Sequence, residues 1–231
     1  MSWSSDPKNI IVEFLRTNLI DPRSRAESTE TDTFSGTGAS QTLTLTPSSG
    51  KAYAITGITV DGSSINKWQD YTIDLQNQKI YGTFASGTSN IIVTFKKGTS
   101  NWIYPSLAKT SSLSSTSYPR INVLLVGSSG TRMGMEGSSP APINETMHFQ
   151  VDIWVKEDYY YNDGTNIWSG DGLAMYLARR IVIAFEDNIS QLYPNLFDFN
   201  LLNIRDAVWE KDAEIYHVIL EFEIDGTSVG G

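Results

Sequence analysis

The sequence predicts an α+β domain that is interrupted by an all-β insertion domain. Helical and long strand patterns occupy residues 1–33 and 118–231, which are expected to close into one discontinuous domain because neither part has enough apolar surface alone. Residues 34–117 differ in composition: they are rich in Thr, Ser and Gly and contain no Glu or Arg. Their short strand patterns, with turns about every ten residues, predict a small β-sandwich-like unit.

The first element is a helix expected over Pro7–Asn18. Asp6 can cap its first turn, and Pro7 suits the first helical position because proline has no N–H to lose there. One face is apolar and carries, at helical spacing, Ile10, Ile11, Phe14 and Leu15. Asp21-Pro22 ends the pattern, and the charged, Ser/Thr-rich segment Arg23–Thr33 is expected to be a linker.

Alternating apolar and hydroxyl-bearing residues mark the strands of the insertion. They are expected at Thr42–Thr46, Ala54–Val60, Tyr71–Leu75, Lys79–Phe84 and Ile91–Phe95. The pair Asp61-Gly62 predicts a turn after the second of them. The run Lys109–Ser117 is rich in Ser and Thr and is expected to be a flexible connector.

The second part of the discontinuous domain begins with a buried strand at Ile121–Val126. The segment Gly127–Pro142, rich in Gly, Pro and Ser, is expected to be a long mobile loop. A long strand follows at Met147–Glu157, where apolar and polar residues alternate. The remaining elements are a helix at Leu173–Asn188 and strands at Asn200–Val208 and Glu214–Asp225.

Composition and charge exclude several classes of function. The chain has 231 residues, 40% of them apolar, and no Cys, so disulfides, thiolate metal sites and cysteine nucleophiles are excluded. No apolar run is long enough to span a bilayer, and the first residues lack the pattern of a secretory signal. The net charge is −9, divided into +3 on residues 34–117 and −12 on the rest. An acidic body argues against tight binding to phosphate backbones.

No pattern of catalytic residues stands out, so no enzymatic activity, cofactor or metal site is predicted. His148 and His217 could form a metal pair or supply a general base, but no third ligand recurs at metal-site spacing, which favours ordinary strand residues. Asn162-Asp163-Gly164 and Asp171-Gly172 could be calcium-loop fragments, yet turn chemistry explains both. The carboxylates Glu221 and Glu223 share one strand face, where a solvated surface is expected.

Aromatic residues in expected loops are the candidate binding residues. One loop holds Tyr159, Tyr160, Tyr161 and Trp168, and three consecutive tyrosines cannot all face one core. Trp68, Trp102 and Tyr104 are candidate surface aromatics of the insertion, as a carbohydrate-binding or adhesion module would need. The alternative interpretation is that Trp68, Tyr71 and Trp102 fill the core of the insertion.

The two outer segments resemble the tail terminator, or tail completion, proteins of long-tailed phages. The resemblance is one of pattern and is carried by Pro7–Asn18, Tyr118-Pro119-Arg120-Ile121-Asn122-Val123 with the long loop behind it, Phe149–Val155, Leu173–Asn188, Asn200–Val208 and Leu220-Glu221-Phe222-Glu223-Ile224. The insertion is similar to β-modules of phage and prophage structural proteins in Ile58–Gly62, Asp70–Leu75 and Lys79-Ile80-Tyr81.

The resemblance implies a virion structural protein whose antiparallel sheet is flanked by two helices. It implies a ring, usually a hexamer, that caps the tail tube and joins the tail to the head connector at the head–tail junction, after assembly in the host cytoplasm. Its partners would be copies of itself, the tail tube protein and the connector or neck protein. DNA would pass through the lumen without specific binding, and no membrane would be involved. The candidate interface residues are Arg132, Met133 and Met135 in the long loop, which such a ring would order on contact with the tube, and the loop aromatics Tyr159, Tyr160, Tyr161 and Trp168.

Other functions stay open at this point. Most members of the resembled family lack an insertion, so a neck or head–tail adaptor protein, or a tail-tube subunit, is an alternative to a terminator. A carbohydrate-binding or adhesion module is a further alternative from a different class. A hydrolase lacks support, because the sequence contains no nucleophile motif.

Overall fold

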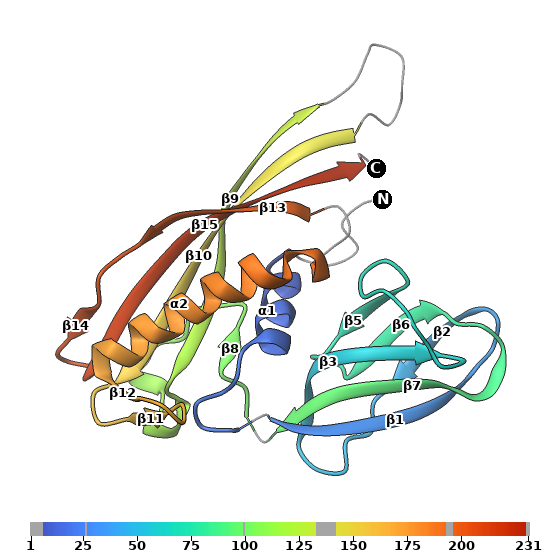
Figure 1. The fold of residues 1–231 in the computed structure, drawn as a ribbon, viewed down its shortest axis with the longest axis horizontal. Coiled ribbons are helices and arrows are strands. Elements are labelled where there is room, and N and C mark those ends of the chain that lie inside the picture. The colour runs from blue at the N-terminus through green and yellow to red at the C-terminus, as the bar shows by residue number, and fades with distance from the viewer. Residues whose placement is uncertain (1–6, 26, 99, 133–141, 193–195, 230–231) are drawn as a thin grey trace. The chain divides into compact units, whose positions relative to one another are not determined.

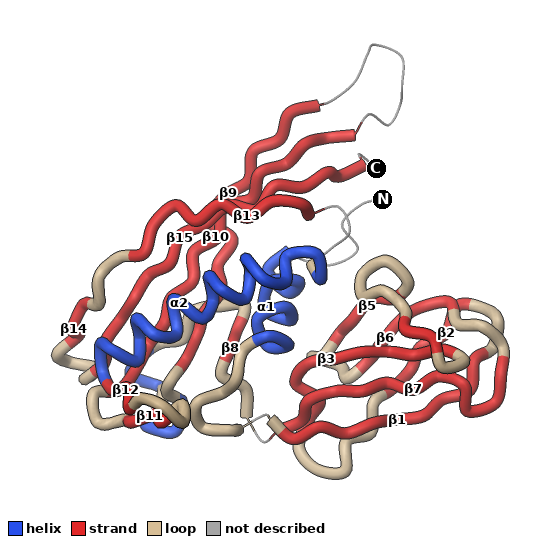
Figure 2. Tube along the Cα trace, in the orientation of Figure 1, coloured by secondary structure: helices blue, strands red, loops and turns tan. Residues whose placement is uncertain are grey.

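The computed structural model of the chain describes residues 7–25, 27–98, 100–132, 142–192 and 196–229. Fifteen strands and two α-helices lie within these residues, and strands make up 51% of the structure (Figure 2). The predicted α+β class, an antiparallel sheet flanked by two helices, is therefore wrong: the protein is mostly β, and its strands are distributed over several sheets.

The chain divides into two compact units. Unit 1 holds the described residues of Met1–Leu15, Trp102–Ser190 and Asn195–Gly231, and unit 2 holds those of Arg16–Asn101 and Gln191–Pro194. Composition suggested boundaries after residues 33 and 117 instead. The difference follows from strand pairing, because β1 (Ser28–Gly36) pairs with β7 (Gly87–Gly98) in unit 2, while β8 (Ile103–Tyr104) pairs with β9 (Arg120–Arg132) in unit 1.

Unit 2 is built from two antiparallel sheets with one apolar core between them. The strand orders are β1-β7-β3-β4 and β2-β6-β5 (Figure 1). The further strands are β2 (Ser40–Thr44), β3 (Lys51–Val60), β4 (Ser63–Ser64), β5 (Tyr71–Asp74) and β6 (Lys79–Thr83). The core takes residues from both sheets, namely Leu43, Leu45, Ala52, Ile55, Ile58, Tyr71, Ile80, Phe84, Ile91, Val93 and Phe95. Alternation along each strand sends these residues inward and Thr and Ser outward.

The turn between β3 and β4 is the one that the sequence predicts. Asp61 has φ 51° and Gly62 has φ 80°, so both residues adopt the left-handed conformation. Asp-Gly is a preferred pair for such two-residue hairpin turns, because Gly has no Cβ and Asp tolerates positive φ.

The helix α1 (Pro7–Asn18) is found where it is predicted. Carbonyl groups at its C-terminal end accept hydrogen bonds from the Lys96 ammonium, which lies 3.4 Å from the oxygen of Arg16 and 3.2 Å from that of Leu19. A cation at a helix C-terminus is favourable for the helix dipole. The chain then turns around the buried carboxylate of Asp21, which accepts hydrogen bonds from the backbone N–H and the guanidinium of Arg25.

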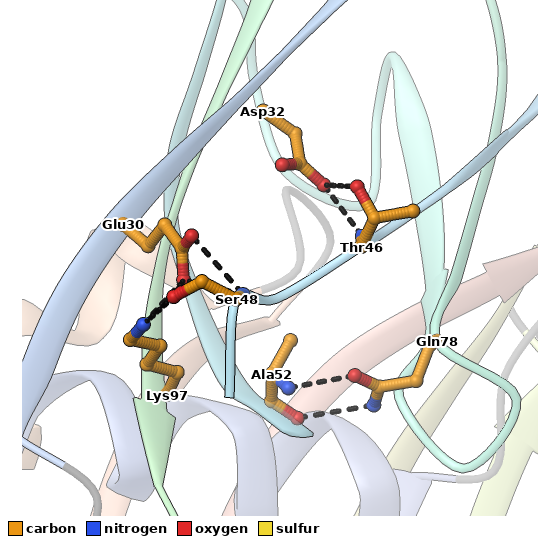
Figure 3. Close-up of polar contacts among 7 residues, drawn as sticks. All are labelled: Glu30, Asp32, Thr46, Ser48, Ala52, Gln78 and Lys97. Carbon is orange, nitrogen blue, oxygen red and sulfur yellow. Dashed lines mark hydrogen bonds and ion pairs between the residues drawn. The ribbon is translucent and has the colours of Figure 1, made fainter. Parts of the chain in front are cut away.

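Two carboxylates of β1 hold the connection that leads from β2 to β3 (Figure 3). Asp32 accepts the backbone N–H of Thr46 at 2.6 Å, and Glu30 accepts that of Ser48 at 3.1 Å. Glu30 also forms an ion pair of 2.7 Å with Lys97 on β7, which lowers the pKa of Glu30, with the Ser48 N–H adding to the effect. Backbone groups that the sheets leave unpaired are thus satisfied by side chains.

The side chain of Gln78 binds the backbone at the start of strand β3 (Figure 3). Its side-chain oxygen accepts the N–H of Ala52 at 2.6 Å, and its side-chain nitrogen donates to the Ala52 carbonyl at 3.1 Å. The amide therefore replaces a neighbouring strand at the start of β3. Gln78 has φ 58°, so its backbone lies in the left-handed region.

Replacing Gln78 by Ala should lower the free energy of unfolding of unit 2 by about 1–3 kcal/mol, because a buried N–H and a carbonyl lose their partners. Urea unfolding and hydrogen exchange at the Ala52 amide measure the effect. Gln76→Ala, at an exposed position in the same turn, is the matched control and should change stability by less than about 0.5 kcal/mol. Equal effects of the two substitutions would contradict the role assigned to Gln78.

Unit 1 is built on one large sheet with strand order β13-β15-β10-β9-β8, and β14 also pairs with β15. The bounds are β10 (Pro142–Lys156), β13 (Leu196–Ile204), β14 (Val208–Glu210) and β15 (Ile215–Val229). The loop expected over Gly127–Pro142 is wrong in its first part, because β9 continues to Arg132, whereas its expected end coincides with the start of β10 at Pro142. Residues 133–141 lie outside the described residues.

One face of this sheet is apolar and packs against helix α2 (Gly170–Asn188) (Figure 1). Aromatic rings carry much of the packing: Phe149 stacks on Phe222 with centroids 5.4 Å apart, and Phe185 of α2 stacks on Phe199 at 4.6 Å and on Phe14 of α1 at 4.8 Å. Such offset ring pairs add to the free energy of area burial. The far ends of β9, β10 and β15 extend past the helix (Figure 1).

Short elements complete the described chain. They are the hairpin strands β11 (Tyr160–Asn162) and β12 (Ile167–Ser169) and the 3-10 helices η1 (Thr110–Ser112), η2 (Ser115–Ser117) and η3 (Ile189–Gln191). Within the described residues, neither α-helix combines the length and the apolar character needed to cross a bilayer.

Candidate functional site: the polar face and open edges of the unit 1 sheet

The face of the sheet that points away from α2 is polar, and we call it the polar face. It alternates with the apolar face along each strand, so that Phe149 pairs with Phe222 on one face and His148 pairs with Glu223 on the other. This alternation is the one that the sequence predicts for β10 and β15. The polar face carries Arg120 and Asn122 of β9, His148, Gln150, Asp152 and Trp154 of β10, and His217, Glu221, Glu223 and Asp225 of β15.

The part of the polar face near the start of β15, which we call its lower part, holds a buried charge network around His217. Its Nδ1 lies 3.2 Å from Glu210 of β14, and its Nε2 lies 3.7 Å from the nearly fully buried carboxylate of Asp152. Burial alone lowers the pKa of His217, but Asp152 and then Glu210 outweigh burial, so the pKa is raised above its ordinary value of 6.5. Gln150 donates to the same Asp152 carboxylate at 2.8 Å.

Three buried polar atoms of this region have no hydrogen-bond partner within the described part of the chain. They are Nδ2 of Asn122, Nε1 of Trp154 and Nε2 of His217. Asn122 uses its oxygen to accept a bond of 2.7 Å from Arg120, whose guanidinium lies over the Tyr104 ring at 3.5 Å. The printed contacts place His217 between two carboxylates, and within the described residues no three His, Asp or Glu side chains are placed to hold a metal ion.

The part of the polar face near the end of β15, which we call its upper part, is more exposed and carries several carboxylates. His148 Nδ1 lies 2.9 Å from Glu223, Arg205 Nη2 lies 2.5 Å from Glu221, and Asp225 accepts the Thr146 hydroxyl at 2.5 Å. The two histidines that the sequence marks as ordinary strand residues thus each face a carboxylate. Sequence reasoning did not predict these pairs, because their partners are distant along the chain.

Both edges of the sheet are open over part of their length. Within the described residues, no strand pairs with the outer side of β13, and β8 pairs with β9 only at Ile121 and Asn122. We call the stretch Leu196–Ile204 the β13 edge and the stretch Val123–Arg132 the β9 edge. Each presents a row of unpaired backbone N–H and C=O groups, which can pair with another chain.

The two open edges lie at the same height in the sheet. Following the strand register across β15 and β10, Leu196 of β13 is level with Gly130 of β9, and Ile204 is level with Val123. Neighbouring strands are antiparallel throughout β13-β15-β10-β9, so β13 and β9 run in opposite directions. A second copy in the same orientation would therefore place its β13 antiparallel to β9 of the first.

The open edges carry exposed apolar side chains. Edge strands commonly carry residues that prevent pairing with other chains at such positions. Each edge contains a register shift, and the residues at these shifts include Val126, which is 65% exposed, and Leu202, which is 51% exposed. Lys or Pro on an edge strand discourages pairing, and neither edge contains one. The consecutive apolar residues Leu124–Val126 and Leu201-Leu202 break strand alternation, and this was the signal available in the sequence.

The hairpin β11–β12 contains the predicted interface aromatics Tyr159, Tyr160, Tyr161 and Trp168. They divide between two environments: Trp168 stacks on Tyr176 of α2 at 4.8 Å with Tyr161 at 6.0 Å from the same ring, whereas Tyr160 is 67% exposed and Tyr159 is half-buried.

The proposed calcium fragment at Asp163 is a turn. Its carboxylate accepts the indole N–H of Trp168 at 2.8 Å and the backbone N–H groups of Thr165 and Asn166. These bonds, led by the one from Trp168, lower the pKa of Asp163. Asp171, in the second fragment, accepts the N–H of Gly172 at 2.8 Å.

The predicted surface aromatics of the insertion need correction. Trp68 is 5% exposed and Trp102 is 0% exposed, so neither is at the surface. Trp102 and Tyr104 belong to unit 1, and Tyr104 packs under Arg120. The alternative interpretation, in which Trp68, Tyr71 and Trp102 fill the core of the insertion, is confirmed for Tyr71, which belongs to the unit 2 core. It is wrong for Trp102, which is buried in unit 1. Of the other predicted interface residues, Met133 and Met135 lie outside the described residues, and Arg132 is the last residue of β9.

Comparison with known proteins adds no family to this picture. No protein-family model matches the chain, and no curated protein matches it.

Protonation of His217 should stabilise unit 1. Because its pKa is raised on folding, the contribution is complete below the pKa of the unfolded chain and is lost as pH rises through the higher pKa of the folded state. NMR titration of the imidazole should give a pKa above 6.5, and Asp152→Asn should lower it. Glu223→Gln, beside His148, is the control and should leave the titration in place. A His217 pKa at or below 6.5 would contradict the network.

Proposed function

We propose that this chain is a structural assembly protein whose copies join edge to edge into a closed ring, and that the ring belongs to the tail of a virion. The observation that carries the proposal is the pair of open sheet edges at one height in unit 1. Pairing the β13 edge of one copy with the β9 edge of the next satisfies both rows of backbone groups and continues the antiparallel pattern.

The proposed contact uses two different surfaces of the same molecule. Such a head-to-tail contact produces a ring if the rotation between neighbours closes, and a filament if it does not. Val126 and Leu202 would become buried in the contact, and the removal of apolar surface from water would add to the backbone hydrogen bonds. Helix α2 covers the apolar face, and Arg120, Asn122, Asp152 and Trp154 are buried at one end of the polar face, so the exposed end around His148 and Glu223 is the part left to line the lumen.

The virion role rests on the sequence resemblance to tail terminator proteins. The protein would cap the tail tube and join the tail to the head connector, as the hexameric ring that the resemblance implies. The α+β fold implied by the same resemblance is not the fold of this chain, so the ring is argued from the edges alone. Acidic residues Glu221, Glu223 and Asp225 would face the lumen and repel DNA that passes through it.

A neck or head–tail adaptor protein and a tail-tube subunit remain the related alternatives. An adaptor would form the same ring with other neighbours, while a tube subunit would stack into long filaments. Electron microscopy of the purified protein separates a single ring from a filament.

Placing a Lys on either open edge should prevent ring formation, because the ammonium would be buried against a neighbour. Leu202→Lys blocks the β13 edge and Val126→Lys blocks the β9 edge, and each variant should stay monomeric by light scattering after size-exclusion chromatography. Ile183→Lys, on an exposed position of α2, is the matched control and should assemble as the unmodified protein does.

Mixing the two edge variants tests whether the contact joins two different edges. Leu202→Lys retains an intact β9 edge and Val126→Lys retains an intact β13 edge, so an equal mixture should form dimers and nothing larger. Monomers in the mixture, or rings from either variant alone, would overturn the proposed contact.

A further inference from the structure

The outer face of the sheet β2-β6-β5 in unit 2 is lined by hydroxyl groups. Residues on this face alternate with the buried Leu43, Ile80 and Tyr71 that point into the core. The outward residues are Ser40, Thr42 and Thr44 of β2, Lys79, Tyr81 and Thr83 of β6, and Thr72 and Asp74 of β5. We call this surface the hydroxyl face.

Tyr81 lies at the centre of the hydroxyl face. It is 40% exposed, and it is the one exposed aromatic residue among the described residues of unit 2. In the strand register it is directly opposite Thr42 on one side and Thr72 on the other. Side chains directly opposite on neighbouring strands have Cβ atoms about 5 Å apart, so a hydroxyl flanks the ring on each side.

We propose that the hydroxyl face binds a neutral polysaccharide, with a sugar ring stacked on Tyr81 and its hydroxyl groups bonded to Thr42 and Thr72. The C–H groups on one side of a pyranose are apolar and pack on an aromatic ring, while its equatorial hydroxyls both donate and accept hydrogen bonds. Threonine hydroxyls likewise donate and accept, so they satisfy a sugar without carrying charge. Lys79 lies two residues before Tyr81 on the same face and provides a stronger donor at the rim. Asp74, opposite Lys79, accepts hydrogen bonds from the backbone and side chain of Asn77.

The composition of the hydroxyl face favours a sugar over other ligands. A nucleic acid would need a row of Lys or Arg, and this face carries one Lys, Lys79, at the position opposite Asp74 in the strand register. A protein interface is anchored by a cluster of buried aromatic and aliphatic residues, and here one aromatic residue stands alone among hydroxyls. The buried Trp68 takes no part, so the site differs from the one that the sequence suggested.

Binding of soluble pentasaccharides of glucose, of N-acetylglucosamine and of galactose to the full chain tests the proposal. In NMR titrations of the labelled protein at millimolar sugar, at least one should shift the amide signals of β2, β5 and β6 selectively. Tyr81→Ala should weaken that binding about tenfold or more, whereas Tyr81→Phe keeps the ring and should retain it. Ile92→Ala, on an exposed position of β7 in the other sheet, is the matched control.

The absence of binding by all three sugars, or signal shifts confined to other surfaces, would overturn the proposal. Equal affinity of the Tyr81→Ala variant would do so as well. A circular dichroism spectrum identical to that of the unmodified chain excludes misfolding of this surface variant. The hydroxyl face lies in unit 2, so its failure is independent of whether unit 1 forms a ring.

Discussion

The pairing of β10 with β15 is the interaction on which the rest of unit 1 depends. It runs over fifteen consecutive positions, from Pro142 opposite Val229 to Lys156 opposite Ile215, without a register shift. Because side chains alternate with a period of two, a slip of one residue would exchange the apolar and polar faces, so burial of Phe149 and Phe222 under α2 fixes the register. This register also sets the heights at which β9 and β13 are added.

The consequence is a sheet whose central strands have neighbours on both sides and whose edge strands have open backbone groups on one side. The regular central strands bury their backbone groups, while β9 and β13 carry the irregularities and leave one side of each backbone unpaired. Bulges at an edge commonly re-aim side chains, and here Val126 and Leu202 are the exposed apolar residues found at such irregularities. Bulges also discourage pairing at an edge, so the physical argument for assembly rests on the exposed apolar side chains that these two edges carry.

Sequence patterns predict those parts of the fold that depend on local periodicity. The helix at Pro7–Asn18 and the two faces of β10 follow from apolar spacing alone. The first part of β1, Ser28–Thr33, falls in the segment Arg23–Thr33 that was expected to be a linker, because Glu30 and Asp32 suggest a solvated charged segment. In the structure these carboxylates hold the neighbouring connection from β2 to β3. The far part of β9 was expected to be a loop, because Gly and Ser are poor strand formers and only its long pairing with β10 holds it extended. The apolar runs Leu124–Val126 and Leu201-Leu202 are visible in the sequence, but their place at open edges is not, since an edge is defined by which strands are missing beside it.

Covalent crosslinking between copies tests the edge-to-edge contact most directly, and a chain without native Cys makes the result simple to interpret. Ser129 and Asn200 lie on the β9 edge and the β13 edge at nearby heights. A double variant with Cys at both positions, treated with a short bismaleimide, should give a ladder of covalent oligomers that ends at one largest species, the closed ring. Each single-Cys variant should remain uncrosslinked. A double variant that crosslinks no more than the single variants would contradict the account.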